Sequence, residues 1–306
     1  MAAMEPETRL LRYFLAVAKE LNFTRAAETL GIAQPALSAQ IRQLEAQLDV
    51  QLLERTTRSV RLTDAGRIVQ QEGPTALAAL AAVWEAARRA GRGEVGRLRL
   101  AYSPSSGYET APRLVEALHD RHPDIEITAE VLPSAEIVHA VLESRVDVGI
   151  ARTPTATPGT RLRPVRNEPQ GVLVPSDHPL AGHAEVELAA VAEYPILVHA
   201  RSANPTHFDL VADRFRRAGL TPRLIERRMA FDPTMRAVRE GAGVALVGVS
   251  STRELAPGLD WIPLAAPSQR LVVQLILREG APSPVADRFE RVAVATAAAE
   301  GWLDGD

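Results

Sequence analysis

Apolar residues recur at helical intervals over the first third of the chain. One set lies at spacings of four, three and four residues, on one face of a helix that begins near Pro6. Its members are Leu10, Phe14, Val17 and Leu21. A second set has the same spacing in a helix that Pro35 opens, and its members are Leu37, Ile41, Leu44 and Leu48. Thr24 can cap a shorter helix between these two, and Gly31 can supply the left-handed residue that ends it. Two helices joined by a tight glycine-containing turn predict a helix-turn-helix.

The face of the third helix opposite its apolar set should be exposed, and the N-terminal half of such a helix enters the major groove of DNA. Gln34 can contact adenine through N6 and N7, and Ser38 can donate or accept a hydrogen bond. Arg42 can reach a phosphate or a guanine. The residues expected to meet DNA from this helix are Gln34, Pro35, Ala36, Ser38 and Arg42.

A charged, threonine-rich stretch at residues 54–63 predicts a small hairpin, or wing. The net charge of the chain is −3, so DNA binding must depend on a local basic surface. Arg55, Arg58 and Arg61 supply such a surface and suit phosphate contacts, which set the register on DNA and not the sequence.

Residues 64–90 are alanine-rich and helical in pattern, and Thr63 can cap this helix. Its apolar stripe consists of Leu77, Leu80, Val83, Trp84 and Ala87. A stripe this apolar needs a partner, and packing against its own domain is one alternative. Pro74 would cost about 3 kcal/mol inside an uninterrupted helix, so we expect a kink or a break near 72–74.

From Leu98 onward, short apolar runs alternate with helical stretches. The runs occupy residues 98–103, 125–132, 146–151, 195–199, 243–249 and 271–278. This alternation predicts βαβ units and a mostly parallel sheet. About 210 residues are too many for one sheet, so two subdomains are expected. The glycines at 91–96 predict a flexible joint, and the proline-rich stretch 154–169 predicts the first crossover between subdomains.

One stretch of the chain carries a specific resemblance. The string AAETLGIAQPALSAQIRQLEAQLDVQLLERTTRSVRLTDAG, at 26–66, resembles the N-terminal signature of LysR-type transcriptional regulators. In that family a helix with a Q-P-x-L-S core is the recognition helix, and a wing of the form ER-x-x-R-x-x-x-LT follows it. Ala39 stands where the family typically has a basic residue, so that contact is not carried over.

The resemblance implies a fold that is α/β overall, with an all-α winged helix-turn-helix at 5–63 and a long linker helix at 64–91. It also implies an effector-binding domain at 97–306, similar to periplasmic solute-binding proteins, in which two α/β subdomains enclose the ligand. We place subdomain I at about 97–166 and 271–306, and subdomain II at about 167–270.

Ligands of such sheets bind at the carboxyl ends of the strands. Ser105 and Ser134 follow two of these ends and match positions where the family often places ligand-binding Ser or Thr, although serines there are also ordinary helix caps. The helices that begin at both places favour a carboxylate at their N-termini. The full set of expected effector-binding residues is Ser105, Ser134, Arg152, Arg201, Ser202, Asn204 and Phe231.

The effector is therefore expected to be a small anion, an aromatic or a dicarboxylic acid. The pattern GIARTP, RNEP and VPSDHPLA within 149–181 is most similar to family members that sense intermediates of aromatic catabolism. The resemblance also implies a homodimer through 64–91, commonly a homotetramer in the family. The expected partners are double-stranded promoter or operator DNA and, for an activator, RNA polymerase. Two recognition helices one turn apart would contact a partly palindromic site.

Other patterns narrow the function further. The absence of cysteine excludes disulfides, thiol catalysis and Cys-based metal sites. No apolar run reaches 18 residues and the first residues lack a signal-peptide pattern, so we expect no membrane segment and a cytoplasmic protein. The glycines of 91–96 match a dinucleotide fingerprint but precede a strand, so they indicate a hinge. His119 and His122 have no third ligand nearby, so no metal site is expected.

No catalytic triad or carboxylate pair with a defined spacing is present, so we expect no enzyme and no cofactor besides the effector. An effector-independent regulator of the same family is the main alternative. A solute-binding protein is disfavoured by the recognition helix and the missing signal sequence. An enzyme on a two-subdomain fold is disfavoured because the cleft residues lack an evident base.

Overall fold

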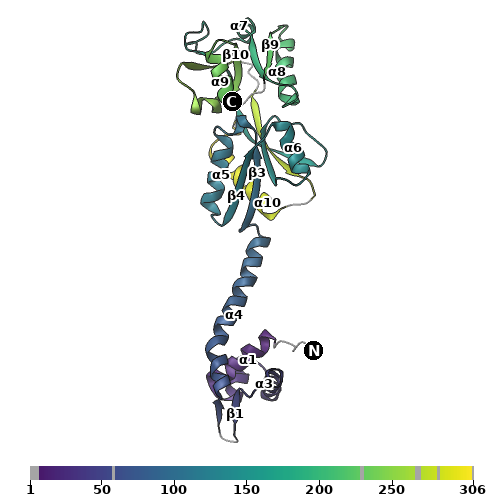
Figure 1. Ribbon diagram of the computed structural model, residues 1–306, viewed down its shortest axis with the longest axis vertical. Coiled ribbons are helices and arrows are strands. Elements are labelled where there is room, and N and C mark those ends of the chain that lie inside the picture. Colours follow the sequence, from purple (N-terminus) through teal and green to yellow (C-terminus); the bar gives the residue numbers. More distant parts are fainter. Residues whose placement is uncertain (1–6, 57–58, 228–230, 266–269, 281–282, 305–306) are drawn as a thin grey trace. The chain divides into compact units, whose positions relative to one another are not determined.

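The structure is a computed structural model that describes residues 7–56, 59–227, 231–265, 270–280 and 283–304 (Figure 1). The side chains of 231–233 and of Glu254 lie outside the described part. The chain divides into two compact units, Met1–Arg88 and Arg89–Asp306. None of the helices in the described ranges combines the length and the apolar character that a membrane crossing requires.

The first unit is a helical domain with a small hairpin. A buried core that includes Phe14, Leu37 and Ile41 holds its helices together. The second helix is capped by Asn22, whose side chain accepts hydrogen bonds from the next turn, so the expected cap at Thr24 is wrong. Gly31 ends this helix at φ 67°, as predicted. The elements are α1 (Thr8–Glu20), α2 (Phe23–Leu30), α3 (Gln34–Leu48), β1 (Leu53–Arg55), β2 (Val60–Leu62) and α4 (Asp64–Gly91).

Helix α4 continues through Pro74, so a break near 72–74 is wrong. Gly73 faces α1 closely, since a Cβ atom there would lie 3.1 Å from Leu11 Cδ1 and 3.2 Å from Leu15 Cδ2. This packing holds the helix on the domain at the point where proline weakens it. Further along α4 the apolar residues are open to solvent, with Val83 57% and Trp84 56% exposed. Packing within its own domain therefore does not cover the stripe.

The second unit contains two five-stranded sheets (Figure 1). The first has the order β4-β3-β5-β12-β6 and the second has the order β11-β7-β10-β8-β9. Strand β3 is parallel to β4 and β5, whereas β12 is antiparallel to β5 and β6. In the second sheet, β10 is parallel to β8 but antiparallel to β7. Both sheets are mixed, so the expectation of a mostly parallel sheet is wrong.

The strands of the first sheet are β3 (Gly96–Tyr102), β4 (Ile125–Val131), β5 (Val148–Arg152), β6 (Thr160–Glu168) and β12 (Leu271–Arg278). Those of the second are β7 (Gln170–Pro175), β8 (Ile196–His199), β9 (Leu224–Arg227), β10 (Val244–Gly248) and β11 (Leu259–Pro263). The chain passes between the sheets at Pro169 and returns between β11 and β12. The stretch 154–169, expected to hold the first crossover, therefore contains it at its last residue, and most of the stretch is strand β6.

Helices cover both faces of each sheet. On the first sheet, the core beneath α5 (Thr110–Arg121) and α10 (Pro284–Ala299) includes Leu114 and Phe289, and a separate cluster lies beneath α6 (Ser134–Leu142). On the second sheet, Phe215 of α8 (Pro205–Arg217) belongs to one cluster and Val238 of α9 (Phe231–Arg239) to another. The remaining elements are η1 (Pro104–Ser106), α7 (Leu188–Ala192) and η2 (Val249–Glu254). These layers bring several strand ends and helix starts together between the sheets.

Candidate DNA-binding helix and ligand cavity

The N-terminal half of α3 presents its polar side chains to solvent. Gln34, Pro35 and Ala36 are exposed, and Leu37, Ile41 and Leu44 are buried on the opposite face, whereas Leu48 is exposed and not buried as expected. Arg42 is exposed and donates from Nη1 to Ser38 Oγ at 3.0 Å. This face is therefore free to contact a groove, with Arg42 and Ser38 already held together.

The hairpin of β1 and β2 is joined to α3 through Arg55. Its Nη2 atom lies 2.7 Å from Glu45 Oε2, and its Nη1 atom donates to Ser38 Oγ at 3.4 Å. The guanidinium also stacks over the ring of Phe23, 4.9 Å from the ring centre. Arg55 thus has partners inside the domain, beside the phosphate role expected for it. Arg61 is exposed, and Arg58 lies outside the described residues.

Glu45 is a residue that the sequence reasoning missed. Besides the ion pair with Arg55, its Oε1 atom accepts hydrogen bonds from the backbone N–H groups of Leu52 and Leu53, each at 3.0 Å. One carboxylate therefore fixes the segment that leads into the hairpin. Its position one helical turn before the end of α3 carried no signal by itself.

A cavity of about 720 Å³ lies between the two sheets of the second unit. From the first sheet it is lined by η1, by the first turn of α6 and by the end of β5. From the second sheet it is lined by the residues after β8 and by the first turn of α8. The backbone N–H of Ala135 donates across it to the carbonyl of Ala203 at 3.2 Å. The predicted residues that line it are Ser105, Ser134, Arg152, Ser202 and Asn204.

Neither predicted serine serves as a helix cap. Ser134 is the first residue of α6, whose N-cap is Pro133, and its hydroxyl has no hydrogen-bond partner among the described residues. Ser105 lies in η1, and its hydroxyl bonds to that of Ser103 at 3.2 Å. The alternative that these serines are only caps is therefore wrong, and both hydroxyls remain at the cavity wall.

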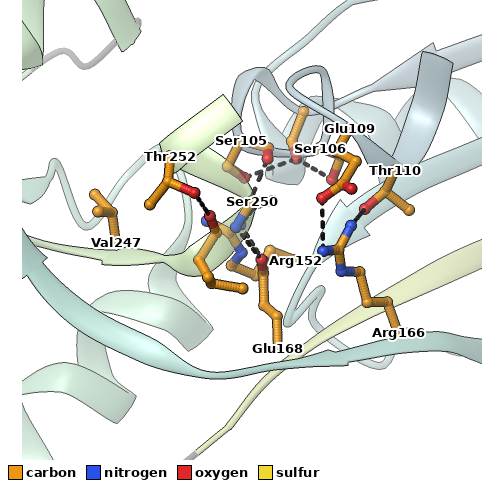
Figure 2. Close-up of polar contacts among 12 residues, drawn as sticks. Ser105, Ser106, Glu109, Thr110, Arg152, Arg166, Glu168, Val247, Ser250 and Thr252 are labelled. Carbon is orange, nitrogen blue, oxygen red and sulfur yellow. Dashed lines mark hydrogen bonds and ion pairs between the residues drawn. The ribbon is translucent and has the colours of Figure 1, made fainter. Parts of the chain in front are cut away.

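Arg152 ends β5 and lines the cavity, and its side chain is only 7% exposed. Its guanidinium forms an ion pair with Glu168 and donates to Ser250 Oγ at 3.2 Å (Figure 2). The backbone N–H of Ser250 in turn donates to Glu168 Oε2 at 3.1 Å. Burial would raise the pKa of Glu168, but Arg152 and the bonds from Ser250 hold that pKa below its ordinary value. The carboxylate therefore stays ionised and partly balances Arg152.

A second buried arginine lies beside this group (Figure 2). Arg166 Nη2 is 2.7 Å from Glu109 Oε2, and its guanidinium lies over the ring of Trp302. Glu109 also pairs with Arg253 of η2 at 2.8 Å. Because η2 follows β10 of the second sheet, Arg253–Glu109 and Ser250–Glu168 both join the two sheets beside the cavity.

Comparison with known proteins places both parts of the chain. A model described as the bacterial regulatory helix-turn-helix protein, lysR family, matches residues 8–67, and a model of the LysR substrate binding domain matches residues 91–298. The chain belongs to the LysR family of transcriptional regulators. It is a DNA-binding regulator with an effector-binding domain, and not an enzyme.

Relatives of this LysR-type regulator match over most of their length. The uncharacterized HTH-type transcriptional regulator YnfL of Escherichia coli K12 is 32% identical over 263 residues, which cover 86% of this chain and 89% of YnfL. CatR of Pseudomonas putida is 31% identical over 282 residues, covering 92% and 96%. The crystal structure of CbnR, a LysR family regulator, matches with a TM-score of 0.79 at 26% identity, covering 94% of this chain and 99% of CbnR.

Two of the predicted effector-binding residues of this LysR-type chain are not among the described residues that line the cavity. The guanidinium of Arg201 is exposed and pairs with Asp209 at 2.7 and 2.8 Å, so its side chain is engaged away from the wall. Phe231 begins α9, and its side chain lies outside the described residues. Arg201 is engaged in this way because the chain after β8 turns into α8, which carries Asp209 eight residues later.

Two histidines that the sequence reasoning missed line the same cavity. His199 ends β8 and His207 lies in the first turn of α8. Asn204 caps α8 by accepting from the His207 N–H at 3.0 Å, and its Nδ2 atom donates to the Arg152 carbonyl at 3.2 Å. The signal available in the sequence was position alone, since His199 ends a strand that reaches the cavity and His207 lies in the helix that follows it.

Proposed function

We propose that this regulator binds promoter or operator DNA through α3 and the hairpin, and that a small carboxylate bound in the cavity controls it. The functional divisions we propose are residues 5–63 for DNA recognition, 64–91 for assembly and 97–306 for effector binding. The exposed polar face of α3 supports the first part. The relative CbnR has been solved in complex with its target DNA, at a TM-score of 0.77 and 26% identity to this chain.

The DNA part is tested by two substitutions with different expected effects. Gln34→Ala should cost about 1–3 kcal/mol on the cognate upstream site and relax base preference. Arg61→Ala should weaken all DNA similarly and reduce the salt slope by about one unit. Fluorescence anisotropy at several salt concentrations separates the two. Identical behaviour of both variants would contradict the division into a base-contacting helix and a phosphate-contacting hairpin.

The observation that carries the effector part is Arg152. It lines the cavity while buried, and its Nε atom has no hydrogen-bond partner among the described residues. Buried polar groups are normally paired, and a guanidinium pairs best with a carboxylate. Ser134 and the start of α6 lie in the same wall, where a helix N-terminus favours negative charge. Glu168 forms an ion pair with Arg152 but does not itself line the cavity. The effector classes we propose remain aromatic and dicarboxylic acids.

Thermal unfolding of the full chain tests this part. Benzoate and succinate are each compared with a neutral amide of the same shape, benzamide and succinamide. A carboxylate at a hundredfold over its dissociation constant should stabilise the effector-binding unit by about 2.7 kcal/mol, and the amide should not. Ser134→Ala should weaken the effect. If no carboxylate of a wider panel raises the midpoint, the effector-independent regulator becomes the better description.

We also propose a homodimer through α4, extending to a homotetramer as in other members of the family. The exposed stripe around Val83 and Trp84 supports it, because contiguous apolar residues exposed along one helix favour burial against another copy. Two recognition helices would then contact adjacent turns of DNA, and RNA polymerase would be the further partner of an activating form. Such a protein works beside the chromosome, in the cytoplasm.

A further inference from the structure

The wall of the cavity that the second sheet supplies contains a pair of imidazoles. The ring centres of His199 and His207 lie 6.1 Å apart with their planes inclined at 67°. Both residues line the cavity, and His207 is 8% exposed. They stand on separate elements, β8 and α8, so the pair exists only where the two elements meet at the ligand space.

Both rings are neutral at ordinary pH. Burial, with a further contribution from Arg152, lowers the pKa of His199 to about 4. Burial, His199, Arg152 and Arg214 lower the pKa of His207 to about 3. Among the described residues, the charged ones that line the cavity are Arg152 and Glu136. The histidine wall therefore offers hydrogen bonds to a ligand and no positive charge.

The polar atoms of this pair have no protein partners among the described residues. His207 Nδ1 is buried without a hydrogen bond. The ring nitrogens of His199 likewise make no hydrogen bond to any described residue, and its interactions there are with the ring of His207 and the charge of Arg152. A neutral imidazole carries one donor and one acceptor, and both rings belong to residues of this cavity wall. A buried polar group without a hydrogen bond costs free energy, so the site favours a ligand that can form hydrogen bonds with these groups.

We propose that His199 and His207 form a hydroxyl subsite, so that the effector is a carboxylate bearing a hydroxyl group. This inference rests on the proposed function, in which the carboxylate lies toward Arg152 and Ser134. A hydroxyl both donates and accepts, so it matches the two rings in either tautomer. A second carboxylate has only acceptors and would be desolvated against uncharged rings. An apolar group would leave the ring nitrogens unpaired. Sites built to pair a ligand hydroxyl discriminate strongly against the analogue that lacks it.

Matched acids test the subsite on the full-length protein. Isothermal titration calorimetry compares benzoate with 2-, 3- and 4-hydroxybenzoate, and succinate with 2-hydroxysuccinate. For at least one hydroxyl position, the hydroxylated acid should bind about tenfold more tightly or better than its parent. In His207→Phe and His199→Phe, which keep a ring of similar size, the ratio of the two affinities should fall to about one.

Further variants guard against a general loss of folding. His199→Asn and His207→Gln retain a donor and an acceptor and should keep part of the preference. His119→Phe, which changes an exposed histidine of α5, should keep all of it. If carboxylates bind in an Arg152-dependent way but the hydroxyl makes no difference, or the Phe variants keep the wild-type ratio, the hydroxyl subsite is wrong and the proposed function stands. If no carboxylate binds at all, both are wrong.

Discussion

The carboxylate of Glu45 and the guanidinium of Arg55 form an ion pair, 2.7 Å between Oε2 and Nη2, that joins α3 to the hairpin. The second oxygen of Glu45 accepts from two consecutive backbone N–H groups just before the hairpin. Arg55 in turn reaches Ser38, on the face of α3 that we propose contacts DNA. One glutamate thus sets the helix and the hairpin relative to each other, the two parts proposed to contact bases and phosphates.

Glu45→Ala should destabilise the first unit by about 2–3 kcal/mol, because it removes the acceptor of two backbone N–H groups and leaves Arg55 without its partner. Glu45 is only 12% exposed, so water replaces these bonds incompletely. Urea unfolding of the full chain, followed by helical circular dichroism, measures the change. Glu28→Ala, at an exposed position of α2, is the matched control and should cost less than about 0.5 kcal/mol. Equal effects at both positions would contradict the role given to Glu45.

The helix-turn-helix could be predicted from the sequence because its determinants are local. The apolar spacing, Gly31 and the position of Gln34 at the helix start all lie within one stretch of chain. Ser134 and Arg152 could be placed at the cavity for a similar reason, since Arg152 ends a strand and Ser134 begins the helix that follows another. The position of a residue next to a strand end is thus enough to place it at the edge of the sheet where the strands end.

Strand β6 could not be recognised from the sequence because of the prolines within and around it. Pro164 lies within it, where the strand is at the edge of the sheet and its register with β12 is irregular. Proline is tolerated at such places because the missing N–H interrupts no central ladder.

The partners of Arg152 could not be predicted from the sequence either. Ser250 and Glu168 are 82 residues apart and meet only when η2 packs against the first sheet.

Gly248→Ala should destabilise the second unit by about 3 kcal/mol. A Cβ atom at Gly248 would lie 2.5 Å from Glu168 Cδ, which is too close for any contact. The carboxylate would have to move away from Arg152 and Ser250, leaving buried charges without partners. Differential scanning calorimetry separates the melting of the two units. Gly91→Ala, where no atom lies within 4 Å, is the control. A second unit as stable as wild type would show that Glu168 can be relocated without cost.

Trp84→Arg should abolish self-association through α4 while leaving the fold of the protomer intact. Trp84 is 56% exposed, so a charge there costs a single chain little. In an interface between two copies the same charge would be buried without a partner. Analytical ultracentrifugation gives the mass of each form, and Gln71→Glu, at an exposed position of the same helix, should behave as wild type. An unchanged mass for Trp84→Arg would mean that assembly uses another surface.

The buried histidines make the stability of the second unit depend on pH. His199 has a pKa of about 4 when folded, against 6.5 for an ordinary histidine, because burial and Arg152 oppose its protonation. Between these two values the unfolded chain binds more protons than the folded one, so the free energy of unfolding falls as the pH falls. The slope for one such group approaches about 1.4 kcal/mol per pH unit. His207, with a pKa of about 3, acts in the same direction.

Denaturant unfolding at pH 7.5, 6.5, 5.5 and 4.5 should therefore show a nearly constant stability above pH 6.5 and a progressive loss below it. His199→Gln cannot titrate, so it should remove about 2 kcal/mol of the loss between pH 6.5 and 4.5, whatever it does to stability at pH 7.5. His207→Gln should reduce the dependence of stability on pH over the same range.

A hydroxy acid bound to neutral rings should also bind with little change in affinity from pH 6.5 to 8, because neither ring titrates there. A variant slope equal to that of wild type would mean that the histidines are not held neutral by their surroundings, and the uncharged character of this wall would then be wrong.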